Sequence, residues 1–363
     1  MKIKEIKVGQ VSAPLKKPFK TALRTVYQVE NIGVMVITDT GNIGYGEAAP
    51  TAVITGDTKG SIIDAIENYI APSLIGLEVH NIEEIMHRMH KSILGNTSAK
   101  SAVDMAIYDL YGQYHNAPLY KLLGGYRSEL ETDLTISVNS PEEMAKDSIE
   151  AVERGYKVLK IKVGLDGELD IKRVQAIRDA VGYDVELRLD ANQGWEAKEA
   201  IRIIRIMEDK GFNIELIEQP VIAKDFQGLK YVTDNVDTPI LADESVFSPE
   251  DAIEIIQSRA ADLINIKLAK AGGIYNALKI CSIAEIYNIE CMVGSMLETK
   301  LSVSAAAHLA AAKKIITKMD LDGPGLCSED SVEGGPIFKE YKIKLNREPG
   351  LGFKNMVKWS QIY

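Results

Sequence analysis

The chain has 363 residues, of which 46% are hydrophobic and 26% are charged, a composition typical of a folded globular protein. At roughly 150 residues per domain, this length allows two or three domains, or one large barrel with a smaller partner. The formal net charge of −10 argues against a nucleic-acid-binding protein, which needs a basic face to neutralise phosphates.

Targeting signals and cysteine motifs are missing from the sequence. The first seven residues, M-K-I-K-E-I-K, lack the apolar core of a secretory signal peptide. The longest apolar-biased run, Ala305–Ala312, is interrupted by His308 and is far shorter than the ~20 residues of a membrane helix. Cys281, Cys291 and Cys327 are widely spread and form no C-x-x-C motif, which disfavours disulfides and thiolate zinc sites. We therefore expect a cytoplasmic protein without a nucleic-acid or membrane partner.

The first 125 residues are predicted to form an α+β domain. A strand through Ile3, Ile6 and Val8 is expected to end in a loop containing Pro14 and Pro18. Two further strands and three helices follow, predicted at residues 32–37, 43–47, 62–70, 82–93 and 99–114. Strands followed by helices are typical of a compact α+β unit.

Residues 126–325 alternate short apolar runs with amphipathic stretches, and the pattern predicts parallel β/α units. The predicted strands are Asp133–Val138, Val158–Val163, Val185–Ala191, Ile214–Glu218, Ile240–Asp243, Leu263–Leu268, Glu290–Gly294 and Lys318–Asp322. The stretches between them include predicted helices at Pro141–Arg154, Leu169–Val181, Ala197–Lys210, Pro249–Gln257, Tyr275–Tyr287 and Leu301–Ala312. Eight such strands most simply close into a barrel. A doubly wound open sheet is the alternative, but no G-x-G-x-x-G motif opens the first helix.

The last barrel strand is followed by Gly323-Pro324-Gly325, where we expect no helix. The remaining segment, residues 326–363, has a predicted strand at Tyr341–Leu345 and is expected to return to the N-terminal domain. The fold class is therefore α/β, a (β/α)7β TIM-like barrel whose N-terminal α+β capping domain is completed by the C-terminal tail.

Charged residues recur near the carboxyl ends of the predicted barrel strands, where barrel enzymes place their chemistry. They are Lys160, Lys162, Asp190, Glu218, Asp243, Lys267, Asp320 and Asp322. Because strand side chains alternate, Lys160 and Lys162 should share one face, as should Asp320 and Asp322. Arg188 and Glu244 do not belong to this set of acids flanked by lysines, and we expect each to form a supporting salt bridge.

Three carboxylates on consecutive strands, with no histidine among them, indicate a hard cation bound by oxygen, and Mg²⁺ fits best. The five histidines fall on predicted helices or their ends and form no H-E-x-x-H motif, so we interpret them as structural. Lysines on strands at either side of the acidic strands should have lowered pKa values near a divalent cation and other lysines. Such bases around a metal-bound carboxylate could move a proton at its α-carbon, which indicates racemisation, epimerisation or a one-base syn elimination.

The motifs K-I-K, D-A-N, I-E-Q-P, A-D-E-S and N-I-K-L-A-K-A-G-G, in this order, resemble the enolase superfamily, muconate-lactonising subgroup. The resemblance covers the whole chain and implies a lysine-based, Mg²⁺-dependent mechanism. It implies Asp190, Glu218 and Asp243 as the Mg²⁺ ligands and Lys162 and Lys267 as two opposed bases. Lys160 would help to neutralise the substrate carboxylate. Lys270 is a poorer candidate than Lys267, because it lies past the strand.

Within the subgroup, Asp320-Leu321-Asp322 resembles the D-x-D motif of dipeptide epimerases, in which two carboxylates suit an incoming ammonium group. The resemblance also places Arg24 where it would pair with the side chain of a glutamate at the second position. Phe19, Thr135 and Leu297 are further candidates for substrate contact. The expected substrate is an L-Ala-D/L-Glu dipeptide of murein-peptide recycling, turned over by a homo-oligomer. The alternatives are a broader dipeptide epimerase, a muconate cycloisomerase, an o-succinylbenzoate synthase or a non-catalytic binding protein.

Overall fold

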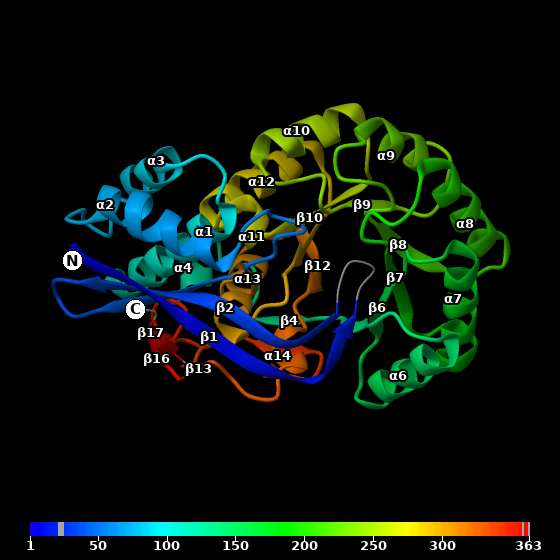
Figure 1. The fold of residues 1–363 in the computed structure, drawn as a ribbon, viewed down its shortest axis with the longest axis horizontal. Coiled ribbons are helices and arrows are strands. Elements are labelled where there is room, and N and C mark those ends of the chain that lie inside the picture. Colours follow the sequence, from blue (N-terminus) through cyan, green and yellow to red (C-terminus); the bar gives the residue numbers. More distant parts are fainter. Residues whose placement is uncertain (21–24, 358, 362–363) are drawn as a thin grey trace.

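A computed structural model describes residues 1–20, 25–357 and 359–361 of the chain. Its largest sheet is an eight-stranded parallel array in sequence order, as predicted (Figure 1). The strands are β5 (Leu134–Ile136), β6 (Val158–Lys162), β7 (Glu186–Asp190), β8 (Ile214–Glu218), β9 (Ile240–Ala242), β10 (Leu263–Lys267), β11 (Cys291–Gly294) and β12 (Ile316–Asp320). The first and last strands meet where Asp133 N–H donates to Met319 O at 3.3 Å, so the array is a nearly closed barrel.

Helices surround the barrel and form its outer arc (Figure 1). They are α6 (Pro141–Glu153), α7 (Gly167–Val181), α8 (Ala197–Asp209), α9 (Phe226–Thr233), α10 (Pro249–Ser258), α11 (Leu268–Ala271), α12 (Ile274–Tyr287), α13 (Lys300–Ala312) and α14 (Gly323–Leu326). Several begin at a capping side chain, as when Ser140 accepts from Glu143 N–H and Ser248 accepts from Asp251 N–H. None of the described helices is both long enough and apolar enough to cross a membrane.

Three of these helices differ from the sequence-based expectation, and one of them is the single turn of α11, which directly follows β10. No helix was predicted between residues 218 and 240, where the structure has α9, which follows the N-cap residue Asp225 and contains Gly228. The Gly323-Pro324-Gly325 segment was predicted to be non-helical, yet it forms the single turn of α14. Pro324 is compatible with that turn because it occupies the first turn, where a missing N–H costs nothing.

The N-terminal region forms an antiparallel sheet in the order β17-β1-β2-β3, with β1 (Ile3–Lys20), β2 (Thr25–Thr38), β3 (Ile43–Ala48) and β17 (Trp359–Gln361). The predicted loop at Pro14 and Pro18 is wrong, because β1 continues through both prolines. Among the described residues, β17 pairs with residues 9–11 of β1, and the same edge further along β1 has only an isolated bridge between Leu15 and Cys327. At such an edge a proline removes no ladder hydrogen bond.

The helices of the capping domain are α1 (Lys59–Asp64), a π-helical segment η1 (Ala65–Ile70), α2 (Ala71–Leu74), α3 (Ile82–Ser92), α4 (Thr97–Tyr114) and α5 (Leu119–Leu122). They pack on this sheet or on α4, and α4 also contacts α11 and α12 of the barrel. The central helix α4 is buried along most of its length. It approaches β3 so closely that a Cβ at Gly46 would lie 1.8 Å from Ala102 O. Glycine is therefore required at this point of β3.

The C-terminal tail contributes to both parts of the molecule, with β13 (Val332–Gly334), β14 (Ile337–Lys339), β15 (Lys342–Lys344) and β16 (Phe353–Met356). The predicted tail strand corresponds to β15, which pairs with β4 (Glu129–Glu131) ahead of the barrel rather than with the N-terminal sheet. The segment that joins the N-terminal sheet is β17. The domain boundaries at residues 125 and 325 remain predictions.

Candidate active site

Three acidic side chains lie at the carboxyl ends of neighbouring barrel strands. Asp190 is the last residue of β7, Glu218 is the last residue of β8, and Asp243 directly follows β9. The parallel register pairs Asp190 with Glu218, so both residues stand at the same end of the barrel. All three side chains are almost completely buried.

Lysine ammonium groups contact these carboxylates from both sides. On β6, Lys162 Nζ lies 2.6 Å from Asp190 Oδ2 and donates to Asn192 Oδ1 at 3.1 Å. On β10, Lys267 Nζ lies 2.6 Å from Asp243 Oδ2. Since β7, β8 and β9 separate β6 from β10 in the barrel, the two lysines flank the acidic strands.

Lys160 lies at the centre of the charge cluster. Its Nζ is 3.1 Å from Asp190 Oδ2, 2.7 Å from Glu218 Oε2 and 2.6 Å from Asp320 Oδ2. The side chain is 2% exposed, so these carboxylates replace the water that the ammonium group loses on burial. The structure therefore joins the predicted metal-ligand strands to the predicted D-x-D motif through this one lysine.

Two further side chains hold the acids in place, and the sequence analysis gave neither of them such a role. Lys270 Nζ lies 2.6 Å from Asp243 Oδ1 and also donates to the backbone carbonyl of Asp243. Asn265 Nδ2 donates to Glu218 Oε1 at 2.9 Å. Strand alternation could have found Asn265, which stands two residues before Lys267 on the same strand.

The lysines lower the pKa of Asp190 and Asp243, whereas burial and the neighbouring Asp190 raise the pKa of Glu218 to about 7. Burial alone would raise the pKa of Asp190, but the ammonium groups of Lys162 and Lys160 lower it to about 2. The lowered lysine pKa was predicted for a lysine beside a divalent cation, and the groups of this chain alone have the opposite effect on Lys267. Burial lowers its pKa, and the carboxylates of Asp243 and Glu218 raise it by more, to well above the usual value. A cation shared by the same carboxylates would weaken this effect, because it would compete for their charge.

The donor chemistry of the cluster fits Mg²⁺. All three predicted ligands are carboxylates, the hard oxygen donors that Mg²⁺ prefers. Two of their buried oxygens, Glu218 Oε2 and Asp243 Oδ1, accept no well-directed hydrogen bond despite the nearby ammonium groups. Among the described residues, no three acidic, histidine or cysteine side chains converge as a ready ligand set, because the lysines lie between them.

A small cavity of about 70 Å³ opens beside the cluster. Residues that the sequence analysis singled out line it: Phe19, Thr135, Lys160, Lys162, Lys267, Leu297, Asp320 and Asp322. Val53 and Ile54, from the capping domain, also line it. Their contribution depends on how the capping domain docks on the barrel, which no local sequence pattern specifies. The remaining predicted contact, Arg24, lies outside the described residues.

Asp322 was predicted to share a strand face with Asp320, but it lies beyond the end of that strand. The strand β12 ends at Asp320, and Asp322 has helical backbone angles (φ −81°, ψ −8°) at the start of α14, so strand alternation does not apply to it. Its Oδ2 accepts a hydrogen bond of 2.7 Å from Thr135 N–H on β5. Burial and the neighbouring Asp320 carboxylate raise the pKa of Asp322 to about 6.

A buried carboxylate of the capping domain fixes the loop at residues 295–299. Glu47, on β3, accepts from Thr299 N–H at 3.0 Å, Thr299 Oγ1 at 2.7 Å and Ser302 N–H at 3.0 Å. Asn31, on β2, donates to Glu47 at 2.6 Å and to Leu297 O at 3.2 Å. Because Leu297 lines the cavity, the capping sheet positions part of its wall.

The two charged residues expected to form supporting salt bridges behave differently. Arg188 pairs with Asp133 at 2.9 Å and with Glu215 at 2.6 Å, which confirms the expectation. Glu244 has no lysine or arginine within ion-pair distance among the described residues, and it accepts only from Asn192 Nδ2 at 3.3 Å. Burial and the nearby Asp243 raise the pKa of Glu244 to about 8, which is the opposite of what a salt bridge does.

Two family models match the chain. Residues 3–124 match the mandelate racemase / muconate lactonizing enzyme N-terminal domain, and residues 143–356 match the enolase C-terminal domain-like model. The sequence is 60% identical to the L-Ala-D/L-Glu epimerase of Clostridium acetobutylicum, over 98% of this chain and 99% of that one. It is 46% identical to the hydrophobic dipeptide epimerase of Enterococcus faecalis, over 98% of this chain and 100% of that one.

The chain is also similar to solved structures of dipeptide epimerases. The substrate-liganded complex of the Bacillus subtilis L-Ala-D/L-Glu epimerase has a TM-score of 0.97 and 53% identity, covering 98% of this chain and 100% of that one. The Enterococcus faecalis dipeptide epimerase, complexed with Mg and the dipeptide L-Leu-L-Tyr, has a TM-score of 0.95 and 45% identity at the same coverage.

Proposed function

The chain belongs to the enolase superfamily and is an isomerase, a dipeptide epimerase, and we propose that it inverts the α-carbon of the second residue of L-Ala-D/L-Glu with Mg²⁺ as cofactor. The observation that carries the mechanism is that Lys162 and Lys267 line one cavity from strands on either side of the acidic strands. An epimerase needs one base for each face of a planar intermediate, and two lysines so placed supply both.

In the proposed site, Asp190, Glu218 and Asp243 hold the Mg²⁺ ion. When bound, the ion supplies positive charge that favours ionisation at the carbon next to the substrate carboxylate. The uncharged amine of one lysine takes the proton from the α-carbon, and the electron pair of the broken C–H bond moves into the carboxylate. The ammonium group of the other lysine then returns a proton to the opposite face. Lys160, with its positive charge among the acids, helps to neutralise the substrate carboxylate.

Substrate selection is proposed to divide between the two ends of the dipeptide. Asp320 and Asp322 line the cavity together, and the raised pKa of Asp322 reflects burial and the repulsion between them. A positively charged amino terminus beside the pair would relieve that repulsion. Arg24 is proposed, from the sequence alone, to bind the glutamate side chain. The amine-binding pair favours a dipeptide over the amine-free substrates of a muconate cycloisomerase or an o-succinylbenzoate synthase.

The two-base scheme is tested by exchange of the α-hydrogen in D₂O, measured by mass spectrometry and chiral chromatography. Lys162→Ala and Lys267→Ala should each lose epimerisation in both directions. Each should retain deuterium exchange for only one epimer of L-Ala-Glu, and the retained epimer should differ between the two variants. Lys198→Ala, which changes an exposed lysine on α8, is the control and should behave as the wild type.

Two outcomes would contradict the scheme. Full epimerisation by either variant would show that the lysine is not a base. Exchange of the same epimer by both variants would show that the lysines serve one face. Loss of activity in both variants with unchanged Mg²⁺ affinity, measured by calorimetry, would assign the effect to the bases rather than to the metal site.

The biological setting follows from the proposed substrate. We propose that the enzyme acts in the cytoplasm on murein peptides released during peptidoglycan recycling and that it forms a homo-oligomer. Light scattering of the purified protein tests the oligomer, and a single-chain mass of 39.9 kDa would contradict it.

A further inference from the structure

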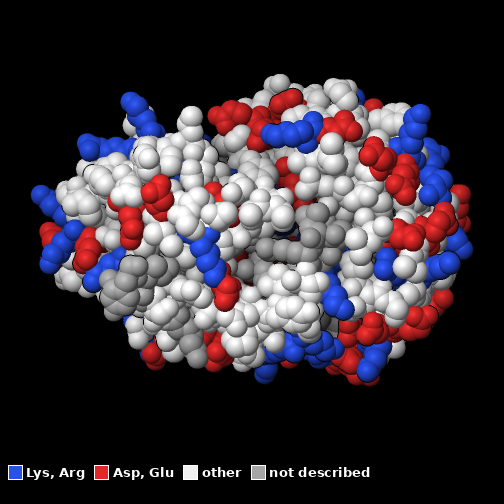
Figure 2. All heavy atoms as spheres, in the orientation of Figure 1, with Lys and Arg blue, Asp and Glu red and all other residues white. Residues whose placement is uncertain are grey.

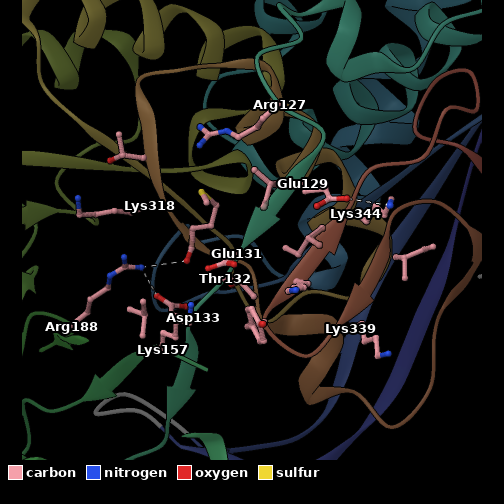
Figure 3. Close-up of a pocket in the computed structure, with 18 residues that line it drawn as sticks. Arg127, Glu129, Glu131, Thr132, Asp133, Lys157, Arg188, Lys318, Lys339 and Lys344 are labelled. Carbon is pink, nitrogen blue, oxygen red and sulfur yellow. Dashed lines mark hydrogen bonds and ion pairs between the residues drawn. The ribbon is translucent and has the colours of Figure 1, made fainter. Parts of the chain in front are cut away.

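A second cavity lies at the amino end of the barrel, away from the strand ends that carry the acidic cluster (Figure 3). Its volume is about 740 Å³, against about 70 Å³ for the cavity of the candidate active site. One wall consists of the residues at and just before the starts of β5 and β6, together with part of β12. The opposite wall is the small sheet of β4, β15 and β14.

The lining of this cavity is strongly basic, in contrast to the chain as a whole. Seven of its lining residues are lysine or arginine and three are acidic, whereas the whole chain has a net charge of −10. Elsewhere the charges are mixed, and Figure 2 shows acidic and basic side chains interspersed around the barrel on the face it presents. A cavity whose lining carries an excess of one sign of charge concentrates ions of the opposite sign.

Some of these cations are already neutralised by protein carboxylates. Arg188 pairs with Asp133, and Lys344 pairs with Glu129 at 3.2 Å, as the dashed lines of Figure 3 indicate. Lys318 pairs outside the cavity wall with Glu290 at 3.0 Å. These pairs account for three of the seven cations.

The other four cations have no carboxylate partner among the described residues. Lys157, Lys339 and Lys342 are exposed and form no ion pair. The guanidinium of Arg127 donates to the backbone carbonyls of Lys313 and Ile316, which carry no charge, and its buried Nε has no hydrogen-bond partner. The cavity therefore holds unneutralised positive charge and an unused buried donor.

The floor of the cavity also offers an acceptor. Asp133 is 1% exposed, and its Oδ2 pairs with Arg188 while its Oδ1 has no hydrogen-bond partner. A buried oxygen without a partner is costly, and a ligand hydroxyl could satisfy it. Thr132 lies next to Asp133 on the same wall (Figure 3).

We propose that this cavity is a binding site for a small, multiply charged organic anion that carries hydroxyl groups. The anionic groups bind Arg127, Lys157, Lys339 and Lys342, and a hydroxyl donates to Asp133 Oδ1. Phosphate esters and polycarboxylates share this chemistry, and separate experiments distinguish them. The site is independent of the proposed epimerase reaction, because none of these residues lines the active-site cavity.

Calorimetry at constant ionic strength tests the site, with fructose 1,6-bisphosphate in one arm and the hydroxylated carboxylate tartrate in the other. The wild-type protein with saturating Mg²⁺ should bind one of them with a stoichiometry of one per chain. In the double variant Lys339→Gln/Lys342→Gln the affinity should fall by up to about 25-fold, since each of the two exposed ion pairs contributes up to about 1 kcal/mol, a factor of about five. Lys198→Gln is the matched control and should bind as the wild type.

Epimerase activity of the double variant should be unchanged, which separates a failure of this site from a failure of the proposed function. Three results would overturn the inference. They are no saturable binding of either anion to the wild-type protein, equal weakening in Lys198→Gln, and binding that is lost in Lys162→Ala but kept in the double variant. The last result would place the anion in the active site.

Discussion

Replacing Glu47 by glutamine should destabilise the protein and impair the active site together. The carboxylate is buried and accepts from Asn31, Thr299 and Ser302. If the glutamine oxygen keeps the bonds from Asn31 Nδ2 and Thr299 N–H, its amide group faces Thr299 Oγ1 and Ser302 N–H. The hydroxyl can rotate and accept, but the backbone N–H of Ser302 cannot. One charge-assisted bond is lost and one buried donor is left unpaired, at a cost of about 2–4 kcal/mol.

The assay is urea unfolding at pH 7.5, combined with steady-state kinetics on L-Ala-L-Glu. The free energy of unfolding should fall by the stated amount. KM should rise because Leu297, held through Asn31 in the same network, lines the active-site cavity. Glu30→Gln is the control: this exposed residue pairs with Lys59, and its loss should cost about 0.2–1 kcal/mol without a kinetic effect. If Glu47→Gln costs no more than the control, the capping sheet does not fix the loop through this carboxylate.

Three further predictions concern the substrate and the effect of pH. Asp322→Asn should lower kcat/KM for all dipeptides by roughly ten- to a hundredfold, because every dipeptide presents the same ammonium group; an effect confined to acidic dipeptides would contradict this. Arg24→Met should lower kcat/KM for L-Ala-L-Glu by roughly ten- to a hundredfold, because a charge-assisted contact worth about 1.5–3 kcal/mol is lost. A dipeptide with an apolar second residue should be much less affected, and equal losses for both dipeptides would refute the glutamate contact. Burial lowers the pKa of His308 to about 3. Because the unfolded chain binds this proton below about pH 6.5, the stability should fall by up to about 1.4 kcal/mol per pH unit as the pH decreases toward 3. Urea unfolding between pH 7.5 and 5 should show a smaller slope for His308→Gln, and an unchanged slope would assign the acid sensitivity to other groups.

The barrel was predictable because each strand is a short apolar run with helical spacing on either side. The predicted strand at Ile214–Glu218 coincides with β8, and the other seven predicted strands overlap β5–β7 and β9–β12. The helix α9 was missed because Gly228 within its short span weakens helix propensity, although Asp225 provides an N-cap by accepting from Gly228 N–H. The π-helical segment at Ala65–Ile70 has no sequence signal, since the isoleucine spacing of four also fits an α-helix.

The sequence predicted those residues of the candidate site that lie at strand ends, but not how their side chains pair or which capping residues join them. The carboxyl ends of parallel strands lie at the same end of the barrel, so residues at these ends are close in space. This rule correctly placed Asp190, Glu218 and Lys267 together. The pairing of Lys160 with three carboxylates depends on side-chain packing inside the barrel, and the sequence does not contain that information. Val53 reaches the same cavity from a capping segment that is distant in sequence.

Substitutions of the charged strand residues and of the uncharged loop residues around the cavity should have different effects. The proposed bases and metal ligands lie on barrel strands or directly after them, and each carboxylate contacts two lysines. Replacing one of these charged side chains therefore disturbs the balance of a buried charge cluster, at a cost of several kcal/mol. Val53, Ile54 and Leu297 lie in loops and bear no charge, so replacing them changes the shape of the cavity without disturbing that charge balance. Variation at these three positions should therefore alter which dipeptide is preferred while proton exchange at the α-carbon persists. Substituting them by residues of different size and measuring deuterium exchange across a dipeptide library tests this. Loss of exchange for every dipeptide would show that the loops also support the chemistry.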